Sequence, residues 1–283
     1  MLQDLEYGRL ENEFHVGHPT SEDVLICVKG NYVLINRAAD DTLTLPTVHQ
    51  VNTSLWDHWD AEPYRYIFKM QDRDYYLWMG EGGDADGFAY EDMRSLRQMV
   101  SKEVCFAVMT ARHLYMWYRD NRFCGRCGTA TVHDGKERML LCPHCGNMIF
   151  PKICPAVIVA VTDGDRLLLT KYAGRSYTRY ALIAGYTEIG ETLEQTVQRE
   201  VMEEVGLKVK NLRYYKSQPW GVDGNILMGF YCDLDGSDQI RLDETELSVA
   251  QWHDRHNLPA HDDGISLTRQ MIRVFEEGRE PRK

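Results

Sequence analysis

Three glutamates fall within five positions of the stretch GETLEQTVQREVMEEVGL, residues 190–207: Glu200, Glu203 and Glu204. On a helix these positions are i, i+3 and i+4, so the three carboxylates share one face and repel one another. A divalent cation between them would relieve that repulsion, and hard carboxylate oxygens suit Mg²⁺ or Mn²⁺. The spacing therefore favours a metal site, with a solvated acidic helix face as the alternative.

The residues around the glutamates predict the helix that this spacing requires. The stretch contains no proline and is rich in residues that helices tolerate. Thr192 is a candidate N-cap, and Gln195 three residues later completes a capping-box pattern. Gly206 is a candidate stop in the left-handed conformation. We therefore expect a helix over residues 193–205, with its apolar side packed on a sheet.

The glutamates belong to a longer pattern that begins at Gly185. From Gly185 to Leu207 the residues fit G-x5-E-x7-R-E-U-x-E-E-x-G-U, where U is aliphatic, at every specified position. A chance match in a chain of this length is on the order of one in ten million at average residue usage. The pattern is the Nudix box, so the chain resembles the Nudix family. The resemblance implies a loop–helix–loop that binds divalent metal and hydrolyses a nucleoside diphosphate linked to another group.

Four cysteines form a second metal pattern. Cys124 with Cys127 and Cys142 with Cys145 are two C-x2-C pairs, each followed by glycine and separated by fourteen residues. Four thiolates at this spacing close a tetrahedral shell around Zn²⁺, which predicts a structural zinc with no open position. Residues 120–149 are too few to build a core, so the metal should supply their folding energy.

Composition and charge limit the classes of function. The chain has 283 residues, which suggests about two domains, and 43% of them are hydrophobic. The net charge of −11 divides into −8 for residues 1–119, +1 for residues 120–151 and −4 for residues 152–283. Broad, sequence-independent nucleic-acid binding is therefore disfavoured, and a polyanionic substrate must be attracted by local devices such as metal ions.

The first residues and the remaining cysteines bear on the compartment. The N-terminal residues are acidic and polar, unlike a signal peptide, and no apolar run reaches transmembrane length. We expect a cytoplasmic protein without a membrane partner. In that compartment the cysteines outside the two pairs should be buried reduced thiols rather than disulfides or nucleophiles: Cys27, Cys105, Cys154 and Cys232.

Hydrophobic patterning predicts the elements that position these residues. Apolar runs around KGN and QDRD predict hairpins over 23–36 and 64–81, followed by helices over 90–100 and 106–120. On the second helix, His113 and Tyr115–Tyr118 are interpreted as core or interface packing rather than ligands. After Pro151 the expected strands are 156–161, 166–172, 180–188, 208–220, 225–234 and 249–254, and a closing helix covers 265–278.

The order of these parts indicates which group of Nudix proteins the chain resembles. An N-terminal domain, a Cys₄ ribbon, a Nudix box and SQPW ten residues after the box resemble the NADH pyrophosphatase family over about residues 105–275. Bacterial members of that family also remove NAD caps from RNA. The resemblance implies an α/β fold: a Nudix α/β/α sandwich (151–283), preceded by a Cys₄ zinc ribbon (120–150) and an α+β N-terminal domain (1–119). It also implies a homodimer.

Residue roles follow from the resemblance. Glu200 and Glu204 would be the main Mg²⁺ or Mn²⁺ ligands, and Glu203 a ligand or general base. The carbonyl of Ala184 is similar to a family metal ligand. Arg199 resembles the residue that orients a box carboxylate, and Glu191 is the remaining box acid.

Further residues would bind substrate. Tyr186 resembles an aromatic that stacks on a base, and Trp220 a pocket residue contributed across the dimer, with core packing as the alternative for both. Gln218 belongs to the same SQPW signature. Phe150 replaces a family tyrosine and loses its hydroxyl. Glu246 matches an acid that reaches the metals from a later loop, with a surface acid as the alternative.

The turn after SQPW departs from the family. Where the family continues with Pro-Phe-Pro, this chain reads SQPWGVDGNILM, which is one residue longer and lacks both prolines. Two glycines predict a more flexible turn. The function expected is hydrolysis of the pyrophosphate bond of NADH or NAD⁺, with NAD-capped RNA as a further target. ADP-ribose, a dinucleoside polyphosphate, or a non-catalytic nucleotide sensor remain as alternatives.

Overall fold

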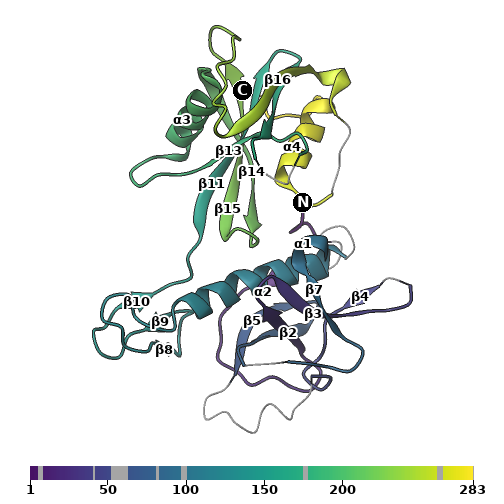
Figure 1. The fold of residues 1–283 in the computed structure, drawn as a ribbon, viewed down its shortest axis with the longest axis vertical. Helices are drawn as coiled ribbons and strands as arrows, with labels where there is room; N and C mark the ends of the chain where they lie inside the picture. The colour runs from purple at the N-terminus through teal and green to yellow at the C-terminus, as the bar shows by residue number, and fades with distance from the viewer. Residues whose placement is uncertain are drawn as a thin grey trace. The chain divides into compact units, whose positions relative to one another are not determined.

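The computed structural model describes residues 1–5, 9–40, 42–51, 63–80, 83–96, 101–174, 178–259 and 264–282. The chain divides into two compact units, and many of their elements are labelled in Figure 1. The unit that carries the box, here called the box unit, comprises Met1–Leu2, Ile153–Trp220 and Asn225–Lys283. The other, here called the ribbon unit, comprises Gln3–Lys152 and Gly221–Gly224.

A mixed sheet forms the centre of the box unit. Within the described residues its strands run in the order β14-β15-β11-β12-β16, with β13 paired to β11. The strands are β11 (Cys154–Asp163), β12 (Arg166–Tyr172), β13 (Ile183–Tyr186), β14 (Val209–Trp220), β15 (Asn225–Leu234) and β16 (Leu247–Asp254). The helices are α3 (Leu193–Val205), α4 (Leu267–Glu276) and the short 3-10 helix η2 (Arg255–Asn257).

Strand β11 supplies both hydrophobic cores of this unit. Val157, Val159 and Val161 belong to a buried cluster that contains the apolar side of α3. The alternate residues Ile158 and Ala160 belong to a second cluster that contains the apolar side of α4. Because successive side chains of a strand point to opposite faces, one helix covers each face of the sheet. This arrangement confirms the predicted α/β/α sandwich (Figure 1).

Helix α3 has the bounds that the sequence predicts. The Thr192 hydroxyl accepts from the backbone N–H of Gln195 at 3.3 Å, and the Gln195 side chain accepts from the backbone N–H of Thr192 at 2.8 Å. At the other end Gly206 has φ +69° and donates to the Met202 carbonyl. Local capping therefore determines where the glutamate helix begins and ends.

The ribbon unit has its own mixed sheet. Within the described residues the order is β1-β5-β6-β2-β3-β4, with β7 paired to β3. Its strands are β1 (Leu10–Glu11), β2 (Val24–Lys29), β3 (Tyr32–Arg37), β4 (Leu43–Thr44), β5 (Tyr64–Met70), β6 (Arg73–Trp78) and β7 (Ala89–Asp92). Both predicted hairpins are confirmed, as β2–β3 and β5–β6.

The helices of this unit differ in part from the prediction. Residues 90–92, expected to be helical, lie in β7, and only Met93–Leu96 form the short helix α1; residues 97–100 lie outside the described residues. Pairing of β7 with β3 overrides the helical preference of this segment. Helix α2 (Lys102–Asp120) extends the second predicted helix, and Ser101 caps it by accepting from the Val104 N–H.

The aromatic residues of α2 pack as expected, with Trp117 and Tyr118 buried. The half-buried His113 has its Nε2 2.7 Å from the Lys152 carbonyl oxygen. The ribbon itself is a small sheet of β8 (Val132–His133), β9 (Leu140–Leu141) and β10 (Met148–Ile149), in the order β10-β9-β8.

The turn Gly221–Gly224 groups with this unit rather than with the strands on either side of it. Arg112 of α2 donates to the Val222 carbonyl at 2.5 Å. A Cβ on Gly221 would lie 2.2 Å from the carbonyl oxygen of Met109, so only glycine fits that position. Close approach of backbone to backbone therefore explains this glycine, which the sequence had indicated as a source of flexibility.

None of the helices in the described parts of the chain has the length and apolar character that crossing a membrane demands.

Candidate active site

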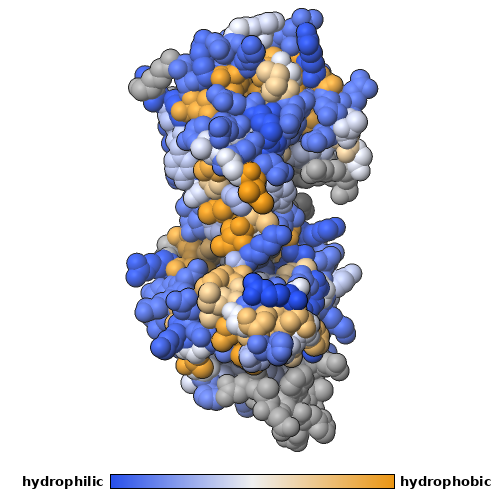
Figure 2. All heavy atoms as spheres, turned by 90° about the vertical axis from the view of Figure 1, so that its left-hand side faces the viewer, coloured by the Kyte–Doolittle hydropathy of each residue, from blue (hydrophilic) through white to orange (hydrophobic). Residues whose placement is uncertain are grey.

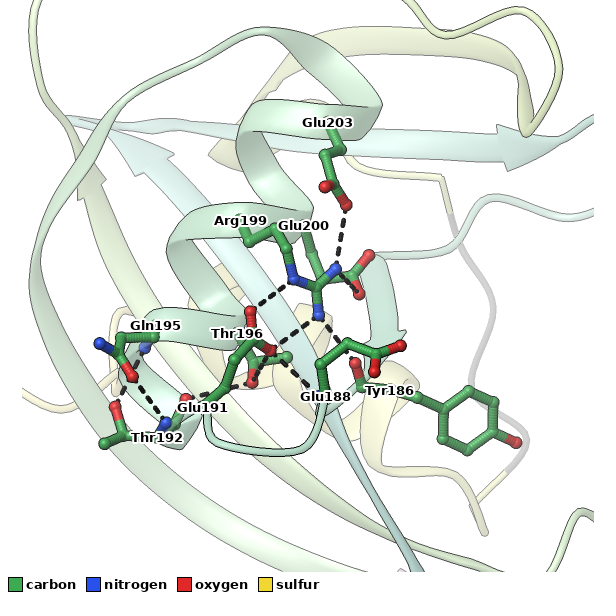
Figure 3. A network of polar contacts seen from close by, with 9 residues as sticks. All are labelled: Tyr186, Glu188, Glu191, Thr192, Gln195, Thr196, Arg199, Glu200 and Glu203. Carbon is green, nitrogen blue, oxygen red and sulfur yellow. Dashed lines mark hydrogen bonds and ion pairs between the residues drawn. The ribbon is translucent and has the colours of Figure 1, made fainter.

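Arg199 lies at the centre of the polar network on α3 (Figure 3). Its Nε and Nη2 donate to the two carboxylate oxygens of Glu191, at 2.6 and 2.9 Å. Its Nη1 donates to Glu200 at 2.7 Å and to Glu203 at 2.9 Å, and Nη2 also donates to the Tyr186 carbonyl at 2.9 Å. One guanidinium thus holds three box carboxylates, and the pKa of Arg199 is raised by these partners, Glu191 first.

Glu191 fixes the loop before the helix. Its Oε2 accepts from the Glu188 backbone N–H at 3.1 Å and from the Thr196 hydroxyl at 3.0 Å. Hydrogen bonds from Arg199, then from Glu188, lower the pKa of Glu191 to about 2. Sequence reasoning missed Thr196; a polar residue with no exposed surface, one helical turn after the N-cap, is the signal that could have revealed it.

Glu200 is held against the backbone of β13. A Cβ on Gly185 would lie 1.9 Å from the Glu200 carboxyl carbon, so the first residue of the box is glycine because the carboxylate occupies that space. Glu200 is only 9% exposed. Burial raises the pKa of Glu200, Arg199 opposes that rise, and the charges of Glu203 and Glu246 add to it.

The other expected metal ligands lie on the same side of the unit. Glu204 is buried, at 2% exposure, and the side chain of Glu203 is 59% exposed. Ala184 lies on β13, paired with Ile158 of β11, one residue before the glycine that receives Glu200. Glu246 is exposed in the loop before β16, near enough for its charge to act on Glu200. This oxygen-only donor set fits a hard divalent cation.

The carboxylates are not yet gathered around one point. In the described parts of the chain, the four ribbon cysteines are the only His, Cys, Asp or Glu group of three or more whose ligand atoms all lie within 4.8 Å of one another. On α3 the carboxylates instead share Arg199. A cation would have to draw the exposed Glu203 side chain toward the buried ones.

The expected substrate-binding residues differ from one another in exposure and in their contacts. The Tyr186 ring is 50% exposed and points away from the Arg199 network in Figure 3, with its hydroxyl 3.3 Å from Asn225 Nδ2. Trp220 is 9% exposed at the end of β14. Gln218 is fully buried, and its amide bonds Ile265 O and Leu267 N at 2.7 Å, which ties β14 to the start of α4. The Gln218 amide therefore has a structural role.

Phe150 lies in the other unit. It follows β10 directly, and 52% of its surface is exposed.

The cysteine centre consists of two equivalent knuckles. The Gly128 N–H donates to the Cys124 carbonyl and the Gly146 N–H to the Cys142 carbonyl, at 2.8 and 3.0 Å. Both glycines have positive φ, +73° and +69°. Sulfur–sulfur separations of 3.4 to 3.6 Å join three of the thiol pairs of the centre. A tetrahedral Zn²⁺ with bonds of about 2.3 Å would place sulfurs about 3.8 Å apart, so the four thiols fit zinc.

The remaining cysteines are free thiols. Cys27, Cys105 and Cys232 are buried as expected, whereas Cys154 is half-buried. Burial, with a smaller contribution from Asp84, raises the pKa of Cys27 to about 12, and burial also raises that of Cys232. Thiols of this kind are poor nucleophiles.

Family models match the two parts of the chain that carry the box and the cysteines. Residues 152–275 match the NUDIX domain, and residues 119–150 match the NADH pyrophosphatase zinc ribbon domain. The NAD-capped RNA hydrolase NudC of Pectobacterium atrosepticum is 39% identical over 183 residues, covering 64% of this chain and 70% of that protein. The protein of the same name from Shigella dysenteriae is 40% identical over 183 residues, covering 64% and 71%. A crystal structure of a NUDIX hydrolase from Nitrosomonas europaea has a TM-score of 0.47 at 23% identity and covers 55% of this chain and 91% of that one.

Proposed function

Because the chain belongs to the NudC family of Nudix hydrolases, we propose that it hydrolyses the pyrophosphate bond of NADH or NAD⁺. The products would be AMP and NMNH or NMN. The name of its relatives extends the proposal to RNA that carries a 5′ NAD cap. The observation that carries the proposal is the complete set of box carboxylates, three of them held by Arg199. A nucleotide sensor would not require that set.

Glu200, Glu204, Glu246 and the Ala184 carbonyl would hold Mg²⁺ or Mn²⁺, and Glu203 would be either a further ligand or the general base. When bound, the ions supply charge neutralisation at the two phosphates and an activated water. The chain's own residues do the rest. Arg199 fixes Glu191 and Glu200 before substrate arrives. As a general base, Glu203 would use its exposed carboxylate to take the proton of the attacking water.

Tyr186 would stack on a base or the nicotinamide ring, because half of its surface is exposed beside the box. Such stacking is worth roughly 1–3 kcal/mol per base. Tyr186→Ala should therefore raise the Kd of the dinucleotide about 5–150-fold on that scale. Trp220, at the end of β14, would contact the same ligand, and Gln218 supports β14 from the core. A substrate-binding role for Phe150, a residue of the ribbon unit, rests on the family resemblance alone.

The assembly and compartment form part of the proposal. Several large apolar side chains are exposed, among them Ile189, Met202 and Met148, and Figure 2 shows apolar patches within a mostly hydrophilic face. A homodimer that covers such residues would be expected.

Four reduced cysteines arranged for zinc suit the cytoplasm, where thiols stay reduced. Residues 1–119, 120–150 and 151–283 would act as N-terminal domain, zinc ribbon and hydrolase domain.

Product analysis tests the function. Purified protein is incubated with NADH, NAD⁺, ADP-ribose or NAD-capped RNA, with Mg²⁺ or Mn²⁺, and products are separated by chromatography. We expect AMP and NMNH from NADH, and RNA with a 5′ monophosphate from the capped substrate. Strong hydrolysis of ADP-ribose with none of NADH would contradict the proposed substrate while leaving the chemistry intact. Light scattering of the same preparation should give twice the mass of one chain, 32.8 kDa.

A further inference from the structure

A cavity of about 390 Å³ lies within the ribbon unit, outside the residues assigned above. Its walls come from three places: β5 with the residue that follows β6, the end of α2, and the zinc ribbon. The lining residues are Arg65, Met79, Tyr115, Tyr118, Arg119, Arg122, Phe123, Ala130, Thr131, His133 and Leu140. Three are arginines, four are aromatic or imidazole rings, and none is acidic. In a chain of net charge −11 this is a local concentration of positive charge.

The three arginines of the cavity differ in their ion pairs and hydrogen bonds. Arg119 forms an ion pair with Asp120 at 2.7 Å, which offsets part of its charge. Arg65 donates from Nε to Nε2 of His133 at 2.8 Å. Arg122 is exposed, and within the described residues its guanidinium has no hydrogen bond or ion pair. An unengaged guanidinium at the rim of a cavity is available to an anion from solution.

The rings offer flat surfaces beside these charges. Phe123, the neighbour of Arg122, is 62% exposed, far more than a ring in a core. His133 is also exposed, whereas Tyr118 is buried, and their ring centroids are 5.3 Å apart. Because Arg65 donates to Nε2, the His133 ring is neutral; the packing around it and then the Arg65 charge lower its pKa to about 4. The cavity therefore combines cationic groups with stacking faces, the combination that binds nucleotides.

Hydrogen bonds join the elements that form the walls of the cavity. Arg138 of the ribbon donates to the carbonyls of Tyr66 and Ile67 on β5, at 3.0 and 2.6 Å. The Thr131 hydroxyl lies 2.8 Å from the carbonyl of Asn121, directly after α2. Phe123 and Ala130 form a backbone bridge. A site on these three elements is held before any ligand binds, which lowers the ordering cost of binding.

We propose that this cavity binds one nucleotide of a single-stranded RNA chain, with the phosphate on Arg122 and the base on Phe123. The inference deepens the proposed function, on which it rests, because the chain would be the body of a capped RNA. The C-terminal end of α2 carries partial negative charge, which repels a compact triphosphate more strongly than a singly charged phosphodiester held by Arg122. The overall acidity of the protein disfavours broad nucleic-acid binding but is compatible with one local subsite.

Binding of an uncapped RNA tests the proposal without hydrolysis. The probe is a fluorescein-labelled oligoadenylate of about eight nucleotides, within the usual range of single-strand site sizes, followed by anisotropy without added Mg²⁺ or Mn²⁺. Phe123→Ala should raise Kd about 5–150-fold, the scale of losing one stacked base. Arg122→Ala should also raise Kd and reduce the slope of log K against log salt by about 0.7, the scale of one phosphate contact.

The matched control is Arg126→Ala. Arg126 is an exposed arginine of the same ribbon that does not line the cavity, so its loss removes the same charge without touching the site. Its Kd should equal that of the wild type. Zinc content measured for all three variants shows that the ribbon is folded. Equal binding by the three variants would overturn the proposal, as would displacement of the RNA by AMP or ATP at concentrations near the RNA Kd.

NADH hydrolysis by the same variants separates this inference from the proposed function. We expect kcat/KM for NADH to be unchanged in Arg122→Ala and Phe123→Ala. A fall that parallels the loss of RNA binding would make the cavity part of the dinucleotide site and overturn the inference. A wild type that binds RNA through Arg122 but leaves NADH intact would overturn the proposed function alone.

Discussion

Arg199 and Glu191, eight residues apart and on either side of a helix N-terminus, form a two-pronged ion pair at 2.6 and 2.9 Å. The pair joins the loop to the second turn of α3, so the loop cannot move without breaking two charged hydrogen bonds. Glu191 accepts two further hydrogen bonds, and its pKa falls from the ordinary 4.5 to about 2.

This pair predicts how stability depends on pH. The folded-state pKa of Glu191 is lower than the unfolded one, so its contribution is complete well above pH 4.5 and is lost as pH falls toward 2. The unfolding free energies of wild type and Glu191→Gln should therefore differ most at pH 6 and converge at lower pH. Urea titrations across that range give both values. A difference that stays constant down to pH 3 would refute the assigned pKa.

Arg199→Lys keeps the positive charge but loses the planar fork. We expect kcat to fall roughly 10–100-fold, the usual cost of losing a residue that orients metal ligands, and the Mg²⁺ concentration for half-maximal rate to rise. Steady-state kinetics over a range of Mg²⁺ measure both. Arg213→Lys is the matched control, because Arg213 pairs with Asp233 at 2.8 Å, away from the box. Equal losses in both variants would mean a general effect on the fold.

Glu204→Gln keeps the size of a buried side chain and removes a ligand charge. We expect kcat to fall at least ~100-fold, the scale of losing one main electrostatic stabiliser. Glu194→Gln, exposed in the first turn of the same helix, controls for a change of helix charge and should retain wild-type kcat. If Glu204→Gln turns over NADH at the wild-type rate, Glu204 is not a catalytic ligand.

Gly185→Ala tests the packing of Glu200 against β13. The added methyl would lie 1.9 Å from the carboxyl carbon, so Glu200 must move. A displacement of about 1 Å at a reacting centre can cost on the order of 100-fold, and we expect a loss of that size in kcat. Gly135→Ala, with no atom within 4 Å of the added methyl, should be neutral. Wild-type kcat in Gly185→Ala would show that this contact is dispensable.

Cys124→Ser should remove the zinc. Mass spectrometry should find about one zinc per chain in the wild type and a small fraction of that in the variant, because four thiolates are needed to close the shell. Thermal unfolding should occur at a lower temperature, since the ribbon has no core of its own. Cys154→Ser, a half-buried free thiol outside the ribbon, should keep both zinc and stability. Oxidised cysteine pairs without zinc in the wild type would contradict the centre.

Local signals made much of the site predictable. Thr192, Gln195 and Gly206 set the bounds of α3 through contacts within a few residues, so the sequence predicts them. The predicted helix over 90–100 fails at residues 90–92 because β7 depends on pairing with β3, more than fifty residues earlier. The close approach of Gly221 to Met109 and the cavity beside the ribbon are likewise products of distant contacts. No periodicity or spacing could have indicated them.

The two proposed metal sites of this protein differ in how the chain holds the ligands when no metal is bound. On α3, Arg199 acts as a resident counter-ion: it neutralises part of the acidic cluster from within the chain, so the helix can fold and keep its shape while no catalytic ion is bound. The cysteine knuckles differ, because their four ligands are thiols that lose their protons when they bind zinc. The ribbon would therefore need zinc in order to fold, whereas α3 would keep its carboxylates in place with no catalytic ion bound.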